Sequence, residues 1–208
     1  MGKERVAEAI CGLVLAGGKS SRFGSDKASA PLAGRPMLQW VVSALETVCE
    51  SLVIVRARGQ VLPELQSSVP VVVVEDRYEA KGPLAGLVTG LAAVAQPLSF
   101  AISCDAPLLR PALVTFLAGI AGDHDIVCPY VEGFPQPLAA IYRPATCLPV
   151  FRDCVERDQL KITAAFGPLR TSIVREEAIR AIDPDLRSFR NANRPDAIVE
   201  LERLVSEQ

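Results

Sequence analysis

The sequence contains one histidine and no cysteine pair with C-x-x-C spacing. His124 lies between Asp123 and Asp125 in a turn-like stretch, where a solvated loop histidine is the favoured interpretation. Histidine-based hydrolysis and zinc chemistry therefore lose most of their support. The six cysteines lie mostly in apolar runs, where a free thiol behaves as a small hydrophobic group. This usage predicts a reducing compartment and so favours the cytoplasm.

A strong net charge and a clean membrane-length apolar segment are also missing. The formal net charge of −2 gives no general attraction to polyanions, so binding to nucleic acid is not expected. No residue from 82 to 104 is charged, but prolines and glycines interrupt this stretch. It therefore predicts a buried helix followed by a buried strand, and no membrane segment. The run from Ala9 to Gly18 lacks a small-x-small cleavage site and is interpreted as a strand, not as a secretory signal.

Short β-branched segments recur along the chain, with segments of helical periodicity between them. The β-branched segments are continuous in hydrophobicity, which predicts strands that are buried on both faces of a parallel sheet. The alternation predicts an α/β fold with an open, mostly parallel sheet, helices on both faces and right-handed crossovers. Strands are expected at Ile10–Ala16, Leu52–Val55, Val71–Val74, Ser99–Ser103 and Ile126–Cys128, and helices at Met37–Cys49, Leu84–Ala95 and Pro111–Ala121.

The pattern changes after Pro129. Gln136–Tyr142 alternates like an exposed-edge or antiparallel strand, and Ala145–Arg157 is expected to form a helix. This second half is expected to complete the sheet and to form one wall of a cleft. No repeat or long linker marks a boundary, and 208 residues suit one domain, so residues 1–208 are predicted to form a single domain.

Polar residues follow several predicted strands, at the edge where open α/β sheets bind ligands. Gly17 and Gly18 follow the first strand and let backbone N–H groups approach an anion, while Arg22 and Lys27 bring positive charge. These features predict a triphosphate cradle. The loop is not a Walker motif, because after Gly12-x-x-x-x-Gly17 a glycine stands where the lysine belongs. A surface turn with solvated cations is the alternative, and the position after a buried strand favours the cradle.

Carboxylates follow two further strands. Asp105 comes after the fourth strand, where one or two carboxylates with waters can hold a hard cation that bridges phosphate oxygens. A role as a helix N-cap is disfavoured because Arg110-Pro111 predicts a later helix start. Glu75 and Asp76 follow the third strand and either orient a base or ribose or form a polar turn.

Two later segments complete the candidate site. Residues 81–86 open a helix with small residues, which permits either close approach to a substrate or tight packing of the helix on the sheet. Near the end of the chain, Asn193 and Asp196 predict the cap of a terminal helix, which leaves Asn191 for a functional role.

Taken in this order, these segments resemble the signatures of the molybdenum cofactor guanylyltransferases (MobA type), a family of Rossmann-like nucleotidyltransferases. Leu15-Ala16-Gly17-Gly18 with Arg22, Gly24, Asp26 and Lys27 is similar to the L-A-G-G…R-M-G…D-K signature of the family. Residues 82–86 resemble its G-P-L-A-G segment, residues 104–107 its C-D-x-P segment, and residues 191–195 its N-x-N-T-P segment.

The resemblance implies a Mg²⁺-dependent transfer of GMP from GTP to the terminal phosphate of molybdenum-loaded molybdopterin, with release of pyrophosphate. Such a transfer depends on positioning and charge neutralisation, which the cations and the carboxylate of this chain suit. The N-terminal half is expected to bind the nucleotide, and the C-terminal half to form the acceptor side. The resemblance assigns Leu15, Ala16, Gly17, Gly18, Arg56 and Asp76 to the nucleotide, Arg22 and Lys27 to its phosphates, Asp105 to the nucleotide and Mg²⁺, and Gly82, Pro83 and Asn191 to the acceptor side.

The sequence departs from the family at two positions. Arg56 stands after the second strand where the family usually has asparagine, and Phe23 replaces the usual methionine. A related transferase that uses CTP or another small phosphate acceptor is one alternative, and a nucleotide-binding scaffold for cofactor assembly is another. L-A-G-G favours guanylyl transfer over the L-A-A-G of cytidylyl and sugar enzymes. Expected partners are the two substrates, with hand-over contacts to molybdenum-insertion proteins and molybdoenzymes.

Overall fold

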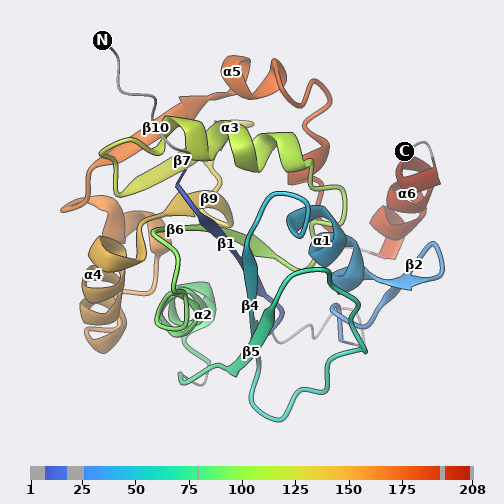
Figure 1. Ribbon diagram of the computed structural model, residues 1–208, viewed down its shortest axis with the longest axis horizontal. Helices are drawn as coiled ribbons and strands as arrows, with labels where there is room; N and C mark the ends of the chain where they lie inside the picture. The colour runs from blue at the N-terminus through green and yellow to red at the C-terminus, as the bar shows by residue number, and fades with distance from the viewer. Residues whose placement is uncertain (1–7, 18–25, 79, 193–194, 207–208) are drawn as a thin grey trace.

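The computed structural model describes residues 8–17, 26–78, 80–192 and 195–206. Figure 1 shows one twisted sheet with helices on both sides. In sheet order its strands are β10 (Thr171–Arg175), β7 (Ile126–Val131), β9 (Ala139–Tyr142), β6 (Leu98–Ser103), β1 (Ile10–Leu15), β4 (Ser51–Arg56) and β5 (Val71–Glu75), and the short β8 (Phe134–Pro135) pairs with β7.

The strand directions confirm an α/β fold with a mostly parallel sheet. β6, β1, β4 and β5 pair in parallel, as do β7 and β10. β9 runs antiparallel to both of its neighbours, β6 and β7. The sheet takes strands from residue 10 to residue 175, and the single domain stays a prediction.

Alternate side chains of β1 enter two separate cores, because successive residues of a strand point to opposite faces. Val14 packs in one core with α1 (Met37–Leu45) and α3 (Pro111–Ala121). Leu13 and Leu15 pack in the other core with α2 (Gly82–Leu91) and α4 (Pro144–Glu156). Figure 1 shows these two helix pairs on opposite sides of the sheet.

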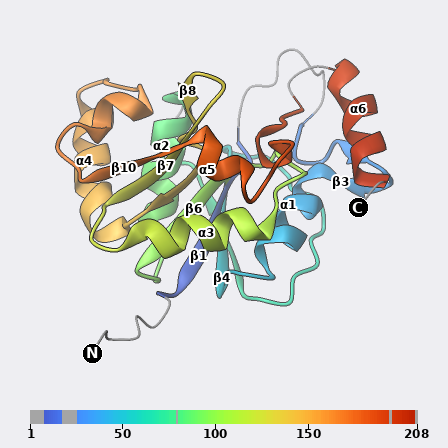
Figure 2. The same cartoon turned by 90° about the horizontal axis from the view of Figure 1, so that it is seen from above.

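The remaining elements lie around the sheet. The terminal helix α6 (Pro195–Ser206) packs through Leu201 and Val205 with Leu32 and Met37 in a third, smaller core. Figure 2 places α6 and α4 at opposite flanks of the molecule. Besides α6, the elements around the sheet are the hairpin β2 (Pro31–Leu32) with β3 (Arg35–Pro36) and the short helices η1 (Ile162–Phe166), α5 (Glu176–Arg180) and η2 (Arg187–Phe189).

The structure decides one alternative about burial, at β9, and shows one sequence prediction to be wrong, at β5. β9 is antiparallel as expected but lies inside the sheet with all four residues buried, whereas an exposed edge was one of the two possibilities. Its small residues Ala139 and Ala140 carry little hydrophobic signal, although each enters one of the two cores. β5 was expected to be buried on both faces, but it is the edge strand, and Val72 and Val73 are each 48% exposed. After β5 the chain crosses back over the sheet, and no strand of the described residues covers this edge.

The small residues of α2 allow the helix to pack closely on β1. A Cβ on Gly86 would lie 3.3 Å from Leu15 Cδ2, and a Cβ on Gly90 would lie 2.2 Å from Leu13 Cδ1. Gly86 therefore serves the packing of helix on sheet, one of the two roles open to this segment. The uncharged stretch from residue 82 to residue 104 forms α2 and β6, as predicted. No helix among the described residues is long and apolar enough to cross a bilayer.

We expect Gly90→Ala to destabilise the protein by about 1–3 kcal/mol, because the added methyl group overpacks the buried contact with Leu13. Gly119→Ala in α3 is the matched control, since a Cβ there meets no atom within 4 Å. That change should stabilise the protein by about 0.5–1 kcal/mol through helix propensity alone. Chemical denaturation of both variants measures the difference. Similar shifts in the free energy of unfolding would contradict the packing role of Gly90.

Candidate functional site

The strand order reverses between β1 and β6. From β1 the chain adds β4 and β5 on one side and then returns to add β6 on the other side. Open α/β sheets bind ligands at such a switch point, outside the carboxyl ends of the strands. Leu15 pairs with Ser103, and the Cys104 N–H donates to the Leu15 carbonyl over 3.1 Å. Residues 16–17 and 104–105 therefore lie side by side at the switch point.

An ion pair joins the loop after β1 to the end of β6. Lys27 Nζ lies 2.7 Å from Asp105 Oδ2, and Asp105 is only 7% exposed. α3 begins at Pro111 with Arg110 at its N-cap position, which confirms that Asp105 does not cap this helix. The structure thus brings together the two charged groups that the sequence placed at the reaction centre.

The second carboxylate oxygen of Asp105 is one of several buried polar atoms without a hydrogen-bond partner among the described residues, and the one that lies at the switch point. Among the described residues, Asp105 Oδ1 is buried and has no hydrogen-bond partner. A buried carboxylate oxygen left in this state is costly, and a cation would satisfy it. The described residues hold no group of three or more His, Cys, Asp and Glu side chains suited to a metal. One protein carboxylate fits Mg²⁺, which keeps several waters and shares phosphate oxygens with a substrate.

Gly17 makes room for the loop after β4. A Cβ on Gly17 would lie 2.7 Å from the backbone nitrogen of Ala57, so no larger residue fits. The Gly17 N–H donates to the Val55 carbonyl over 3.2 Å, as does the Ala16 N–H over 2.8 Å. This corrects the expectation that the Gly17 N–H is open to an anion. Gly18, Arg22 and Gly24 of the same predicted cradle lie outside the described residues.

Arg56 ends β4, and its guanidinium is held by neighbours in the protein. Nη1 donates to the Gln60 carbonyl over 2.8 Å, and Nη2 lies 3.4 Å from Glu75 Oε2. Glu75 Oε2 also accepts a hydrogen bond from the Gly59 N–H over 3.1 Å. Arg56 and Glu75 together therefore order the turn that follows β4.

Asp76 follows β5 and connects this strand to α2. Its Oδ1 accepts hydrogen bonds from Thr89 Oγ1 over 2.9 Å and from the Tyr78 N–H over 3.1 Å. The Asp76 N–H donates to the Arg56 carbonyl over 2.8 Å. Of the two roles left open by the sequence, these contacts establish the polar turn, and contact with a nucleoside stays a prediction.

Gly82 and Pro83 form the start of α2. Gly82 has a φ of +72°, a left-handed conformation that favours glycine, and Pro83 occupies the first turn of the helix. Both residues are exposed, and a Cβ on Gly82 would meet nothing within 4 Å. This glycine therefore serves the turn, unlike Gly86 and Gly90, which serve packing.

The segment around Asn191 returns to the same site from the far end of the chain. The Ala192 N–H donates to the backbone carbonyl of Asp105 over 2.9 Å, and Asn191 is exposed. Asn193, the expected helix cap, lies outside the described residues, and the side chain of Asp196 is not described. Asn191 therefore lies in a loop, outside the helices and strands, and the backbone of the next residue anchors this loop to Asp105.

Gln60 also reaches this site, and the sequence analysis missed it. Its side chain contacts Ala16, Asp26 and Ala57. The residue lies in an irregular connection with no motif, so only its position soon after a strand end pointed to it.

Cys104 lies at the carboxyl ends of β1 and β6, but its thiol is not a nucleophile. Burial, together with the charges of Asp105 and Asp26, raises the pKa of this thiol to about 12. The thiolate is the reactive form, so Cys104 is inert near neutral pH. All six cysteines are free thiols, as predicted.

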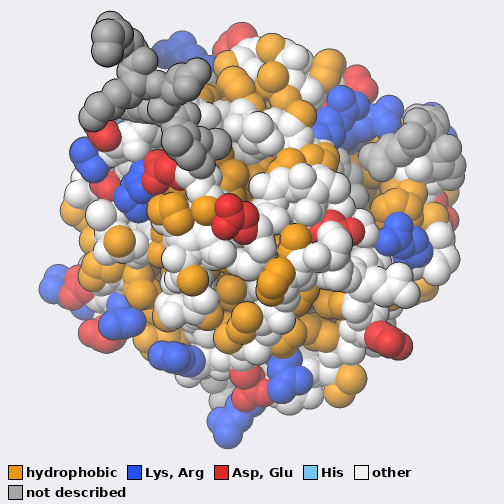
Figure 3. All heavy atoms as spheres, in the orientation of Figure 1, with side chains coloured by type: hydrophobic (Ala, Val, Ile, Leu, Met, Phe, Trp, Pro, Cys, Tyr) orange, Lys and Arg blue, Asp and Glu red, His pale blue; other side chains and the backbone are white. Residues whose placement is uncertain are grey.

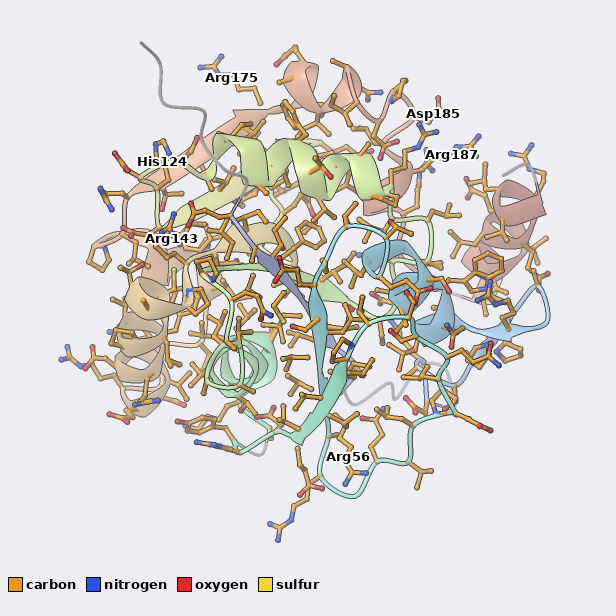
Figure 4. All side chains as sticks on the ribbon, in the orientation of Figure 1. Arg56, His124, Arg143, Arg175, Asp185 and Arg187 are labelled. Carbon is orange, nitrogen blue, oxygen red and sulfur yellow. The ribbon has the colours of Figure 1, made fainter. Side chains whose placement is uncertain are left out.

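His124 lies far from the site. It is exposed in the turn after α3, and Figure 4 shows it near Arg143 at the upper left, whereas Arg56 lies at the bottom. The nearby Asp125 is buried and accepts a hydrogen bond from the Arg170 N–H over 2.8 Å, a contact that fastens β10 to β7. On the face in Figure 3, basic and acidic side chains lie close together around the rim.

The sequence matches the family described as "MobA-like NTP transferase domain" over residues 12–169. A molybdenum cofactor guanylyltransferase of Desulfosudis oleivorans is 32% identical over 95% of this chain and 96% of that protein. A probable molybdenum cofactor guanylyltransferase of Natronomonas pharaonis is 32% identical over 89% of this chain and 93% of that protein.

Solved structures share the fold at low sequence identity. Molybdopterin-guanine dinucleotide biosynthesis protein A of Archaeoglobus fulgidus is 22% identical and superposes with a TM-score of 0.78, covering 95% of this chain and all of that one. The 2-C-methyl-D-erythritol 4-phosphate cytidylyltransferase of Thermus thermophilus is 15% identical with a TM-score of 0.70, over 93% of this chain and 98% of that one. The same sheet thus occurs in proteins named for different nucleotides.

Proposed function

Because the chain belongs to the MobA-like NTP transferase family, we propose that it transfers GMP from GTP to the terminal phosphate of molybdenum-loaded molybdopterin and releases pyrophosphate. The observation that carries this proposal is the ion pair between Lys27 and Asp105 at the switch point, 2.7 Å apart. Two signature segments that lie far apart in the sequence meet there, and a third is bonded to Asp105 through Ala192. A similarity of about a third of the residues to guanylyltransferases, over nearly their whole length, supports the choice of nucleotide.

The proposed reaction forms one bond and breaks one. An oxygen of the terminal phosphate of molybdopterin attacks the α-phosphorus of GTP, and the bond from the α-phosphorus to the bridging oxygen of the β-phosphate breaks. Pyrophosphate leaves with that electron pair. Such transfers need little covalent help from the protein and depend on alignment and on neutralisation of charge. Lys27 supplies a fixed positive charge for this purpose.

The proposal gives each predicted residue a role. Mg²⁺, when bound, neutralises charge on the phosphates, and Asp105 would hold it through the oxygen that lacks a partner among the described residues. Arg56 acts by ordering the turn after β4, and Asn191 lies in the loop anchored to Asp105. We assign Arg22, Lys27 and Asp105 to catalysis, Leu15, Ala16, Gly17, Gly18, Arg56 and Asp76 to the nucleotide, and Gly82, Pro83 and Asn191 to the acceptor side.

The proposal extends to partners and location. The product carries a labile metal centre, so we propose hand-over contacts with a metal-insertion protein and with molybdoenzymes, and no contact with nucleic acid. Five of the six free thiols are buried, which agrees with a reducing compartment such as the cytoplasm. A scaffold that binds nucleotide without turning it over is the alternative of another class, and the intact pair of Lys27 and Asp105 favours the enzyme.

We expect GTP to be preferred over CTP and ATP by at least about tenfold, the factor that about 1.4 kcal/mol provides. Arg56→Asn should leave this preference largely intact, because the guanidinium of Arg56 is held by Gln60 and Glu75. Competition between GTP and CTP for transfer to molybdenum-loaded molybdopterin measures the preference. A preference for CTP would refute the guanylyl assignment and leave nucleotidyl transfer standing. Nucleotide binding without pyrophosphate release would favour the scaffold.

A further inference from the structure

Gln60 joins three segments of the site through one carboxamide. Its Nε2 donates to the Ala16 carbonyl over 3.1 Å and to Asp26 Oδ1 over 2.8 Å. Its Oε1 accepts a hydrogen bond from the Ala57 N–H over 2.8 Å. Both hydrogens of the amide nitrogen and one acceptor position of the oxygen are therefore used within the protein. Gln60 stands outside all four signature segments.

These contacts fix both ends of the loop between β1 and the reaction centre. Ala16 comes just before that loop, and Asp26 comes at its end. Asp26 also accepts hydrogen bonds from the Ala28 N–H over 3.2 Å and from Ser29 Oγ over 3.3 Å, so its carboxylate orders the turn that contains Lys27. Lys27 in turn reaches Asp105.

We propose that Gln60 is a positioning residue for the nucleotide, because it clasps the two ends of the loop after β1 and holds the Asp26 turn from which Lys27 reaches Asp105. This inference rests on the proposed function. Holding Ala16 and the Asp26 turn in place before the nucleotide arrives lowers the entropy lost on binding, so the clasp strengthens nucleotide binding without touching the nucleotide. The clasp needs a side chain that donates twice and accepts once. A carboxamide meets this need, and a carboxylate does not.

The test is Gln60→Glu, assayed for transfer from GTP across a range of pH. The new carboxylate can still accept from Ala57, but it loses both donors and faces Asp26. We expect the KM for GTP to rise about tenfold relative to the wild type near pH 8, with a smaller change in kcat. Two neighbouring carboxylates raise the pKa of one of them, and the protonated form regains a donor. Because this form donates once and the carboxamide donates twice, the ratio of the two KM values should fall as the pH is lowered to about 5 without reaching one.

Gln39→Glu is the matched control. Gln39 fastens the same connection between β4 and β5 with both groups of its amide, since Oε1 accepts from the Gln66 N–H and Nε2 donates to the Gln66 carbonyl, each over 2.8 Å. Its side chain bonds to Ser43 and Gln66 and not to Ala16 or Asp26, so its loss should lower the melting temperature and leave the KM for GTP unchanged. Gln60→Ala removes the clasp without adding charge. It should raise KM by a similar factor that does not depend on pH, and it replaces the Glu variant if that variant does not fold.

The outcomes separate the two proposals. A wild-type protein that turns over no GTP refutes the proposed function. A wild-type protein that is active, with a KM unchanged in both Gln60 variants, overturns the clasp and leaves the function in place. An equal rise of KM in Gln39→Glu also overturns it, because any loosening of the connection would then suffice. A KM ratio for Gln60→Glu that does not fall as the pH is lowered contradicts the role of the donors.

Discussion

Asp105→Asn is expected to keep the fold and to lose about a hundredfold or more of the transfer rate. The amide has nearly the same shape as the carboxylate, and its oxygen can still accept from Lys27. Its NH₂ group then occupies the position of Oδ1, which already has no hydrogen-bond partner among the described residues, so little stability is lost. The variant lacks the negative charge that Mg²⁺ needs, and loss of a principal electrostatic group costs about 10²–10³ in rate. The measurement is kcat/KM for GTP as a function of Mg²⁺ concentration.

Asp125→Asn is the control for this prediction. Asp125 is the other strand-flanking carboxylate with little exposure, 6% against 7% for Asp105, and it serves the pairing of β10 through Arg170. Its change should lower the free energy of unfolding by about 1 kcal/mol and leave kcat/KM unchanged. Normal turnover of Asp105→Asn at limiting Mg²⁺ would show that Asp105 is not the ligand.

The parallel part of the sheet could be predicted because its strands are short β-branched runs between turns. β1, β4, β6 and β7 all begin within one residue of the expected position. β9 and β5 show that such runs do not reveal how deeply a strand is buried in the sheet. Their burial depends on which strand lies beside them, and that is decided by crossovers between distant segments. Ala139 and Ala140 enter the two cores from opposite faces of β9, but alanine gives only a weak hydrophobic signal in the sequence.

The candidate site could be predicted in part for a similar reason. Lys27 and Asp105 each follow a predicted strand, and the carboxyl ends of parallel strands meet at one edge, so the rule for open sheets brings them together. Gln60 follows no regular pattern, and its partners Ala16 and Asp26 lie 44 and 34 residues away in the sequence. The sequence also does not show why residue 17 must be glycine, because the atom that excludes a side chain there is the backbone nitrogen of Ala57, forty residues away.

Lys27→Ala is expected to lower kcat/KM for GTP by about a hundredfold, whereas Lys19→Ala should change it little. Lys27 is the cation held against Asp105, and a fixed charge beside a transferring phosphate is worth about 10²–10³ in rate. Lys19 belongs to the same loop but lies outside the signature positions and outside the described residues. Equal effects of the two changes would mean that the loop contributes only diffuse positive charge.

The free energy of unfolding of Lys27→Ala and of a double variant separates a loss of rate caused by the missing charge from one caused by a weakened fold. Lys27→Ala leaves the carboxylate of Asp105 without its nearby cation, and breaking a largely buried pair is destabilising, here by about 1–2 kcal/mol because Lys27 is 23% exposed. Adding Asp105→Asn to Lys27→Ala removes that unpaired charge. The double variant should regain most of the lost stability and none of the activity. Recovery of activity together with stability would mean that the pair only holds the fold, and the proposed reaction centre would be wrong.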